Sequence, residues 1–129
     1  MQENIFMGLW IFPVMGISLA LTIVVEAGAA FLWNIRNPWD LALTGAVNLL
    51  TNPAVVAAYY LTAGFVRIWG GSEWLWILSP VKVILEVSAI CAEAVCYKAA
   101  GRAVSRPWLF SLTANTASYF IGAGLQWML

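Results

Sequence analysis

The sequence contains few charged side chains and no histidine. Charged residues make up 9% of the 129 residues, against roughly 25% in an average soluble domain. The six basic and six acidic residues cancel, which argues against nucleic acid or another strongly charged partner. Cys91 and Cys96 do not have the CxxC spacing of a redox pair, and without histidine no zinc-ligand pattern remains. We therefore expect neither a metal site nor a cofactor.

The sequence also lacks the motifs of the common enzyme classes. It contains no phosphate-binding loop, dinucleotide-binding fingerprint or nucleophile elbow. No serine or cysteine has an evident activating base beside it. An enzyme, for example one that modifies lipids through Glu and Asn side chains, therefore ranks behind other functions, and we predict no catalytic residue.

Long apolar runs are what the sequence has in abundance. Apolar residues make up 63% of the chain, and the mean hydropathy is +0.86. They form four runs, at about residues 5–33, 39–69, 74–97 and 107–129. Because about 20 apolar residues suffice to cross a bilayer as a helix, the sequence predicts an all-α fold. We expect one integral membrane domain over residues 1–129, a polytopic bundle of four transmembrane helices in the cell membrane. Glu3 and the lack of Lys or Arg before the first run predict that no signal peptide is cleaved.

The basic residues lie mainly in the turns that follow the first and third runs. Arg36 lies in one of these turns, and Lys98, Arg102 and Arg106 lie in the other, whereas the turn after the second run follows Arg67. Short cytoplasmic loops carry an excess of Lys and Arg. We therefore predict that the first and third turns face the cytoplasm and that both termini lie on the extracytoplasmic side.

The second run is interrupted at Thr51, Asn52 and Pro53. Asparagine at an N-cap followed by proline at the first helical position is a common start of a helix. One interpretation is therefore a second helix broken at Asn52-Pro53, whose second half directs free amide groups into the bundle, as in many transporters. The alternative is a proline kink within one helix. The sequence leaves both interpretations open.

Each apolar run carries polar residues along one helical face. In the third run Lys82, Glu86 and Glu93 share a face, because positions four, seven and eleven apart lie close together around a helix. Polar faces are costly in hydrocarbon, so we expect the four faces to turn toward one another. The candidate residues for binding a ligand or a proton are Glu26, Asn48, Asn52, Tyr59, Glu86, Glu93, Ser111 and Asn115.

The two acidic residues Glu26 and Glu93 should lie at similar depth on different helices. Most of the candidate residues fall in the half of the bundle nearer the basic turns, so we expect a polar cavity that opens toward those turns. Two carboxylates in a poorly hydrated pocket repel each other, and we expect them to share a proton or a cation. Glu93 is the first candidate, because it has no basic residue within one turn on its own face. A purely structural interpretation pairs Lys82 with Glu86 as an ion pair and gives Glu26 hydrogen bonds between helices.

These features predict a small transporter or channel-like protein with a carboxylate-lined cavity for a cation, a proton or a small polar solute. Four helices barely enclose a pathway, so we expect a homo-oligomer. The alternative is a non-catalytic membrane subunit whose polar faces contact the helices of a partner in a larger complex. The chain has little mass outside the predicted spans, and this feature fits a transporter and a non-catalytic subunit equally well.

Overall fold

The computed structural model describes residues 11–128, apart from the side chains of Ile11 and Gln126. Within these residues it contains helices and no β-strand, which confirms the predicted all-α fold. The helices are α2 (Ile11–Leu32), α3 (Pro38–Phe65), α4 (Leu78–Ala100) and α5 (Pro107–Met128). A short π-helix, η1 (Val66–Gly70), and a 3₁₀-helix, η2 (Ser72–Ile77), connect α3 to α4. Residues 5–10 of the first predicted span and residue 129 of the last lie outside the described residues.

Three helical segments among the described residues are long and apolar enough to cross a membrane: Phe12–Leu32, Pro38–Gly70 and Ser72–Ala100. Helix α5 has 22 residues, as many as α2, but it is not among these three segments. The described chain therefore has the character of an integral membrane protein. That α5 crosses the bilayer as a fourth span stays a prediction.

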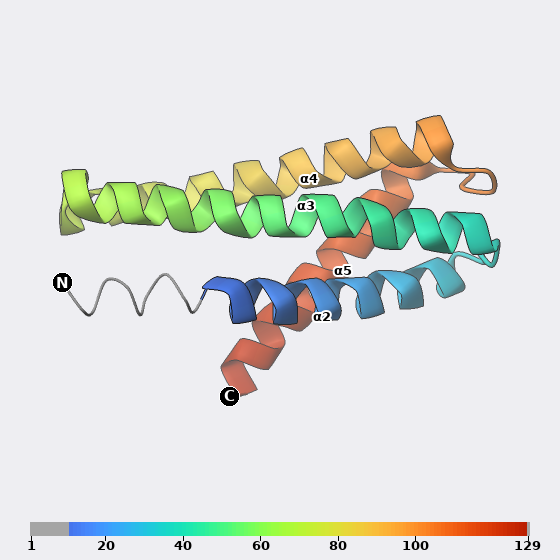
Figure 1. Ribbon diagram of the computed structural model, residues 1–129, viewed down its shortest axis with the longest axis horizontal. Coiled ribbons are helices and arrows are strands. Elements are labelled where there is room, and N and C mark those ends of the chain that lie inside the picture. Colours follow the sequence, from blue (N-terminus) through green and yellow to red (C-terminus); the bar gives the residue numbers. More distant parts are fainter. Residues whose placement is uncertain (1–10, 129) are drawn as a thin grey trace.

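The four α-helices form a bundle in which each helix packs mainly against two others. The contacts run from α2 to α3, from α3 to α4, from α4 to α5 and from α5 back to α2. Figure 1 shows α2, α3 and α4 running along the long axis of the molecule, whereas α5 crosses them obliquely. As a result, α5 contacts α4 through Ser111 and contacts α2 farther along, through Ser118.

The turn between α2 and α3 is determined by its sequence. Asn34 adopts a positive φ of 61°, and the N–H of Ile35 donates to the carbonyl of Ala30 at 2.8 Å. This is the bond that closes a Schellman motif, with the usual apolar contact between the same two residues. Asn37 then caps α3 by accepting the N–H of Trp39 at 2.9 Å. The turn therefore fixes how α2 and α3 pack side by side.

Helix α3 is continuous, with Pro53 inside it. The broken-helix interpretation is therefore wrong; Pro53 lies within one helix, as the alternative required, and the kink at Pro53 stays a prediction. Asn52 does not cap a new helix, because its Oδ1 accepts no hydrogen bond among the described residues, and its Nδ2 donates to Thr22 Oγ1 on α2 at 2.9 Å. Proline removes one backbone donor, and transmembrane helices tolerate this where polar side chains lie nearby.

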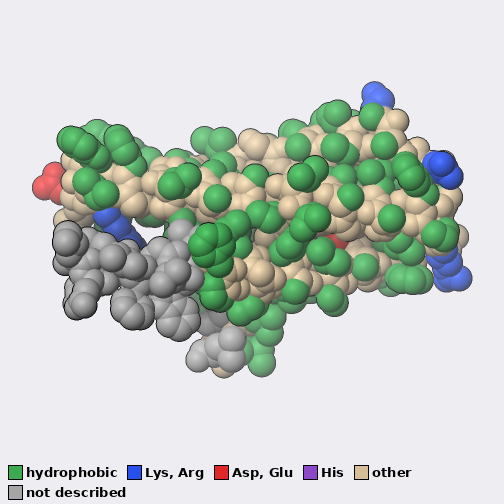
Figure 2. Space-filling view, in the orientation of Figure 1, with side chains coloured by type: hydrophobic (Ala, Val, Ile, Leu, Met, Phe, Trp, Pro, Cys, Tyr) green, Lys and Arg blue, Asp and Glu red, His purple; other side chains and the backbone are tan. Residues whose placement is uncertain are grey.

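The two connections that carry most of the basic residues lie at the same end of the bundle, opposite η1 and η2 (Figure 1). Figure 2 shows Lys and Arg side chains gathered at that end. We call it the basic end, defined by Arg36, Lys98, Arg102 and Arg106. Its location on the cytoplasmic side stays a prediction.

Candidate functional site

Hydrogen bonds between side chains connect all four α-helices. Asn48 Nδ2 donates to Glu26 Oε2 at 2.6 Å and links α3 to α2. Thr51 Oγ1 donates to Glu93 Oε1 at 2.7 Å and links α3 to α4. Asn115 Nδ2 donates to Glu93 Oε2 and links α5 to α4. Three of the four helix interfaces are thus joined through a carboxylate.

The fourth interface, between α5 and α2, closes the circle. Ser118 Oγ donates to Thr22 Oγ1 at 3.1 Å, and Asn52 Nδ2 donates to the same oxygen at 2.9 Å. Thr22 lies one helical turn from Glu26, so the two side chains make their hydrogen bonds from the same face of α2. We call this set the polar ring; it consists of Thr22, Glu26, Asn48, Thr51, Asn52, Glu93, Ser111, Asn115 and Ser118.

The acidic and amide groups of the polar ring are deeply buried. Glu26, Asn48 and Ser111 are 0% exposed and Glu93 is 1% exposed. Buried carboxylates in membrane proteins are costly unless they are paired, and they often mark ion or proton paths. The structure therefore brings together six of the candidate residues predicted from the sequence: Glu26, Asn48, Asn52, Glu93, Ser111 and Asn115.

The other predicted residues lie outside the polar ring. Tyr59, Lys82 and Glu86 contribute to the lining of the same cavity but have no part in the circle of hydrogen bonds. Lys82 Nζ lies 5.1 Å from the centre of the Tyr119 ring, a typical cation–π distance. The Lys82–Glu86 ion pair stays a prediction, although the two charges are close enough to attract each other.

A cavity of about 450 Å³ extends from the polar ring. Its lining comes from residues 14–22 of α2, 48–60 of α3, 82–93 of α4 and 115–125 of α5. In every helix these residues lie between the polar ring and the end opposite the basic end. The cavity is therefore on the far side of the carboxylates from the basic residues.

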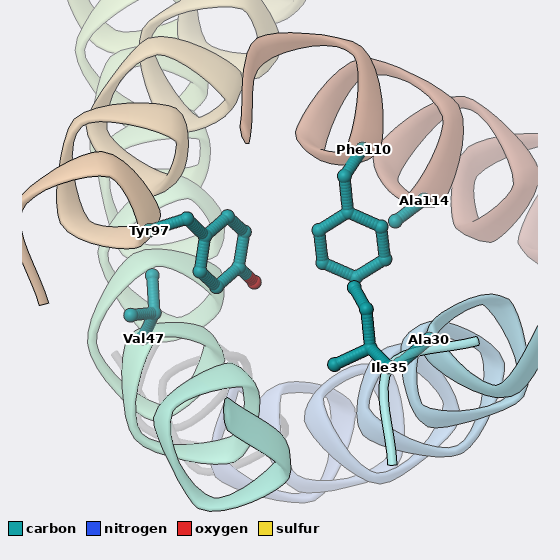
Figure 3. Close-up of a cluster of buried hydrophobic side chains, with 6 residues drawn as sticks. All are labelled: Ala30, Ile35, Val47, Tyr97, Phe110 and Ala114. Carbon is teal, nitrogen blue, oxygen red and sulfur yellow. The ribbon is translucent and has the colours of Figure 1, made fainter. Parts of the chain in front are cut away.

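A cluster of buried apolar side chains fills the space between the polar ring and the basic end. Figure 3 shows Tyr97 and Phe110 projecting into the interior from two different helices. The Phe110 ring centre lies 5.2 Å from that of Tyr97 and 5.9 Å from that of Trp33. We call this set the hydrophobic cluster; it consists of Ala30, Ile35, Val47, Tyr97, Phe110 and Ala114.

The hydrophobic cluster corrects one expectation from the sequence. The predicted opening of the cavity toward the basic end is wrong, because aromatic rings close that end and the cavity extends the other way. The depth of the carboxylates along their helices had suggested that the cavity opens toward the basic end. The polar stripes carry no information about Phe110, which on its own helix resembles any other apolar residue.

The two carboxylates of the polar ring have different surroundings. Glu93 accepts hydrogen bonds at both oxygens: Thr51 binds Oε1, whereas Asn115 and, at 3.5 Å, Ser111 bind Oε2. Glu26 accepts one hydrogen bond at Oε2, and among residues 11–128 its Oε1 has no partner. The sequence favoured Glu93 as the binding group, but the structure leaves Glu26 as the carboxylate with a free oxygen. Donors on neighbouring helices make this difference, and a single helix does not reveal them.

Asp40, which is buried in the first turn of α3, was not predicted from the sequence. Its Oδ1 accepts the backbone N–H of Arg102, and its Oδ2 accepts that of Ala103, both at 2.8 Å. Beside it, Trp39 Nε1 donates to the carbonyl of Ala100 at 2.8 Å. Acidic residues are common in the first turn of any helix, so nothing in the sequence set Asp40 apart. Its role is to hold the connection between α4 and α5 against α3.

Comparisons with known proteins leave the function to be argued from this site alone, because no protein-family model, no curated protein and no solved structure matches the chain.

Proposed function

We propose that this protein is a small membrane transporter that binds a cation, a proton or a small polar solute at the polar ring. The observation that carries the proposal is the position of Glu26 and Glu93. Glu93 lines the inner end of a cavity whose other side is closed by the hydrophobic cluster, and Glu26 is hydrogen-bonded to Asn48, which lines the same cavity. A central site with access from one side and a closed barrier on the other is what alternating access requires.

Electrostatics support a positively charged ligand. Glu26 and Glu93 lie close enough to interact through their charges, and like charges repel strongly in a poorly hydrated interior. A proton or cation that enters the polar ring relieves this repulsion. Because the two carboxylates belong to α2 and α4, its arrival also changes the force between these helices. Binding is thereby coupled to helix packing, which a transport cycle needs.

Neutralising Glu26 tests the proposed function. We expect Glu26→Gln to reduce the flux to the level of protein-free liposomes, because the change removes the charge but nearly preserves the volume. The measurement uses proteoliposomes that contain pH-sensitive and sodium-sensitive dyes, under imposed proton or sodium gradients. Glu73→Gln is the matched control, since Glu73 is exposed on η2. Wild-type flux no greater than that of empty liposomes, or full flux in Glu26→Gln, would contradict the proposal.

The orientation and the fourth span belong to the same proposal. We place the basic end in the cytoplasm and the protein in the cell membrane, following the distribution of Lys and Arg. We place α5 across the bilayer as the fourth span, because Ser111 and Asn115 direct its polar face toward Glu93 inside the bundle. The cavity then opens on the extracytoplasmic half of the protein.

A second hollow, of about 520 Å³, lies between α4 and α5. It contains Lys82 and Glu86 on α4 and Tyr119 on α5, and it exists because α5 leaves α4 at an oblique angle (Figure 1). Charged side chains at this depth are unfavourable next to lipid. A second copy of the chain is the occupant that we propose, since Lys82 and Glu86 make the face self-complementary. A two-fold axis beside α4 lets each lysine meet the glutamate of the other copy.

Cysteine cross-linking tests this arrangement. In a background with Cys91→Ser and Cys96→Ser, Val83→Cys should form disulfide-linked dimers in native membranes, because Val83 lines the hollow. Ile84→Cys is the matched control, because it points in another direction and is 63% exposed, against 62% for Val83. Equal cross-linking at both positions, or none, would contradict the dimer. Cross-linking of Val83→Cys to a different subunit would instead support the alternative, a non-catalytic membrane subunit of a larger complex.

A further inference from the structure

Three of the four buried polar atoms that lack a hydrogen-bond partner share one chemical character. Within residues 11–128 they are Glu26 Oε1, Asn48 Oδ1, Asn52 Oδ1 and the hydroxyl of Tyr97. Tyr97 belongs to the hydrophobic cluster. The other three atoms belong to the polar ring and are pure acceptors. The interface between α2 and α3 therefore offers three oxygen atoms whose partner must be a donor or a cation.

These three oxygens belong to neighbouring side chains at the contact between α2 and α3, because Asn48 is hydrogen-bonded to Glu26. Asn48 and Asn52 lie one helical turn apart on α3, and both line the cavity. The amide nitrogens of both residues already donate hydrogen bonds: Asn48 Nδ2 donates to Glu26, and Asn52 Nδ2 donates to Thr22. With the nitrogen of each amide fixed, the carbonyl oxygen is presented on the other side. Asn48 is 0% exposed, so its Oδ1 is not in contact with bulk solvent.

We propose that Glu26, Asn48 and Asn52 form a site for a dehydrated alkali cation of the size of sodium. The inference rests on the proposed function, because it names the ligand of the same site. Carboxylate and amide oxygens are hard ligands that bind alkali and alkaline-earth cations. Among the proposed ligands, one carboxylate and two neutral amides balance a single positive charge, whereas a divalent ion would have only one charged ligand in a medium of low dielectric constant.

Other ligands fit the site less well. Calcium sites rely on carboxylates and their charge, whereas a single carboxylate oxygen is free here. No group of three or more His, Cys, Asp and Glu side chains suited to a metal ion occurs among the described residues. Side chains held by their own hydrogen bonds cannot retract easily, so a larger ion such as potassium should bind more weakly. A proton satisfies one oxygen but leaves both amide oxygens without a partner.

The remaining charges near the cavity do not oppose a cation at this site. Glu93 lies across the polar ring and adds negative potential, while its own oxygens are occupied by Thr51, Ser111 and Asn115. Lys82 lies eleven residues from Glu93 on α4, or about 16 Å along the helix axis. Its ammonium packs over Tyr119. The positive charge thus lies near the outer part of the cavity, away from the proposed site.

Sodium-dependent stability tests the proposal directly. The purified protein is heated in detergent with NaCl, KCl or choline chloride at equal ionic strength, and the unfolding midpoint is recorded. We expect sodium to raise the midpoint of the wild type in a saturable way, potassium to raise it less, and choline not at all. Glu26→Gln and Asn52→Ala should lose the sodium shift, whereas Glu73→Gln should keep it. Binding of radioactive sodium to the wild type gives a second measurement that does not depend on the variants.

The outcomes separate this inference from the proposed function. A sodium shift that is lost in Glu26→Gln supports the site even if the liposomes show no flux, and the ion is then structural. Flux of protons that depends on Glu26 without any effect of sodium preserves the proposed function and overturns the sodium site. An equal shift with potassium, stronger binding of calcium, or a full sodium shift in Glu26→Gln would also overturn it.

Discussion

Replacing Phe110 by alanine should turn the closed side of the cavity into a leak. Phe110 is 0% exposed and lies between Tyr97 and Trp33 in the hydrophobic cluster. Loss of the ring leaves a void next to the Tyr97 hydroxyl, which has no hydrogen-bond partner among the described residues. Water can therefore enter and bind there. Because hydrophobic constrictions close pores by excluding water, hydration of this cluster should connect the polar ring with the basic end.

The leak can be measured in proteoliposomes as the rate at which an imposed ion gradient decays. We expect the rate for Phe110→Ala to exceed that of the wild type by about tenfold or more, equivalent to a barrier lower by about 1.4 kcal/mol. Phe120→Ala is the matched control, since Phe120 lies on the same helix and is 67% exposed. Phe110→Leu should remain closed, because it fills most of the space with an apolar side chain.

Stability must be followed in the same experiment, because truncation of a buried phenylalanine costs about 3–5 kcal/mol. Size-exclusion chromatography of Phe110→Ala before reconstitution shows whether the bundle has survived. A folded Phe110→Ala that holds its gradient as well as the wild type would show that the hydrophobic cluster is not the barrier. A leak of equal size in Phe120→Ala would also count against the cluster as the barrier.

Replacing Asp40 by alanine should cost more stability than any other single change of a charged residue outside the polar ring. The carboxylate accepts the backbone N–H groups of Arg102 and Ala103, and both lose their partner when it is removed. Arg102 and Ala103 are exposed, so their N–H groups can bind water instead, and the expected loss is that of hydrogen bonds to a charged group, about 1.5–3 kcal/mol. The unfolding midpoint in detergent should fall accordingly.

Limited trypsin digestion shows whether this loss is local. The connection between α4 and α5 contains Arg102 and Arg106, and its release from α3 should accelerate cleavage at these two residues. Asp40→Asn, which keeps one acceptor oxygen, should fall between the wild type and Asp40→Ala. Glu73→Ala serves as a control at an exposed acidic residue. Wild-type stability and cleavage in Asp40→Ala would rule out the anchoring role.

The sequence predicted best those features that depend on the residues of a single helix. The apolar runs predicted helices whose bounds agree with the structure to within a few residues at most ends. The spacing of polar residues identified the face of each helix that turns inward, and it predicted six residues of the polar ring. These features depend on local periodicity, which is written into one segment of chain.

What the sequence did not predict depends on contacts between helices. The free oxygen of Glu26 and the occupied oxygens of Glu93 result from donors on other helices. The direction of the cavity depends on the oblique course of α5, since this angle separates α5 from the first half of α4. Asp40 finds its partners about 60 residues later in the chain, at Arg102 and Ala103. Helical periodicity does not specify any of these relations.

The bond between Ser118 and Thr22 spans 96 positions of the chain, and this has a consequence for biogenesis. Helix α5 is the last of the described helices to leave the ribosome, and it supplies Asn115, a donor to Glu93. Until α5 arrives, the three earlier helices hold their carboxylates and amides without a complete set of partners in the bilayer. Assembly therefore ends in one late step, and nascent chains stalled before α5 should be the form that membrane quality-control proteases degrade.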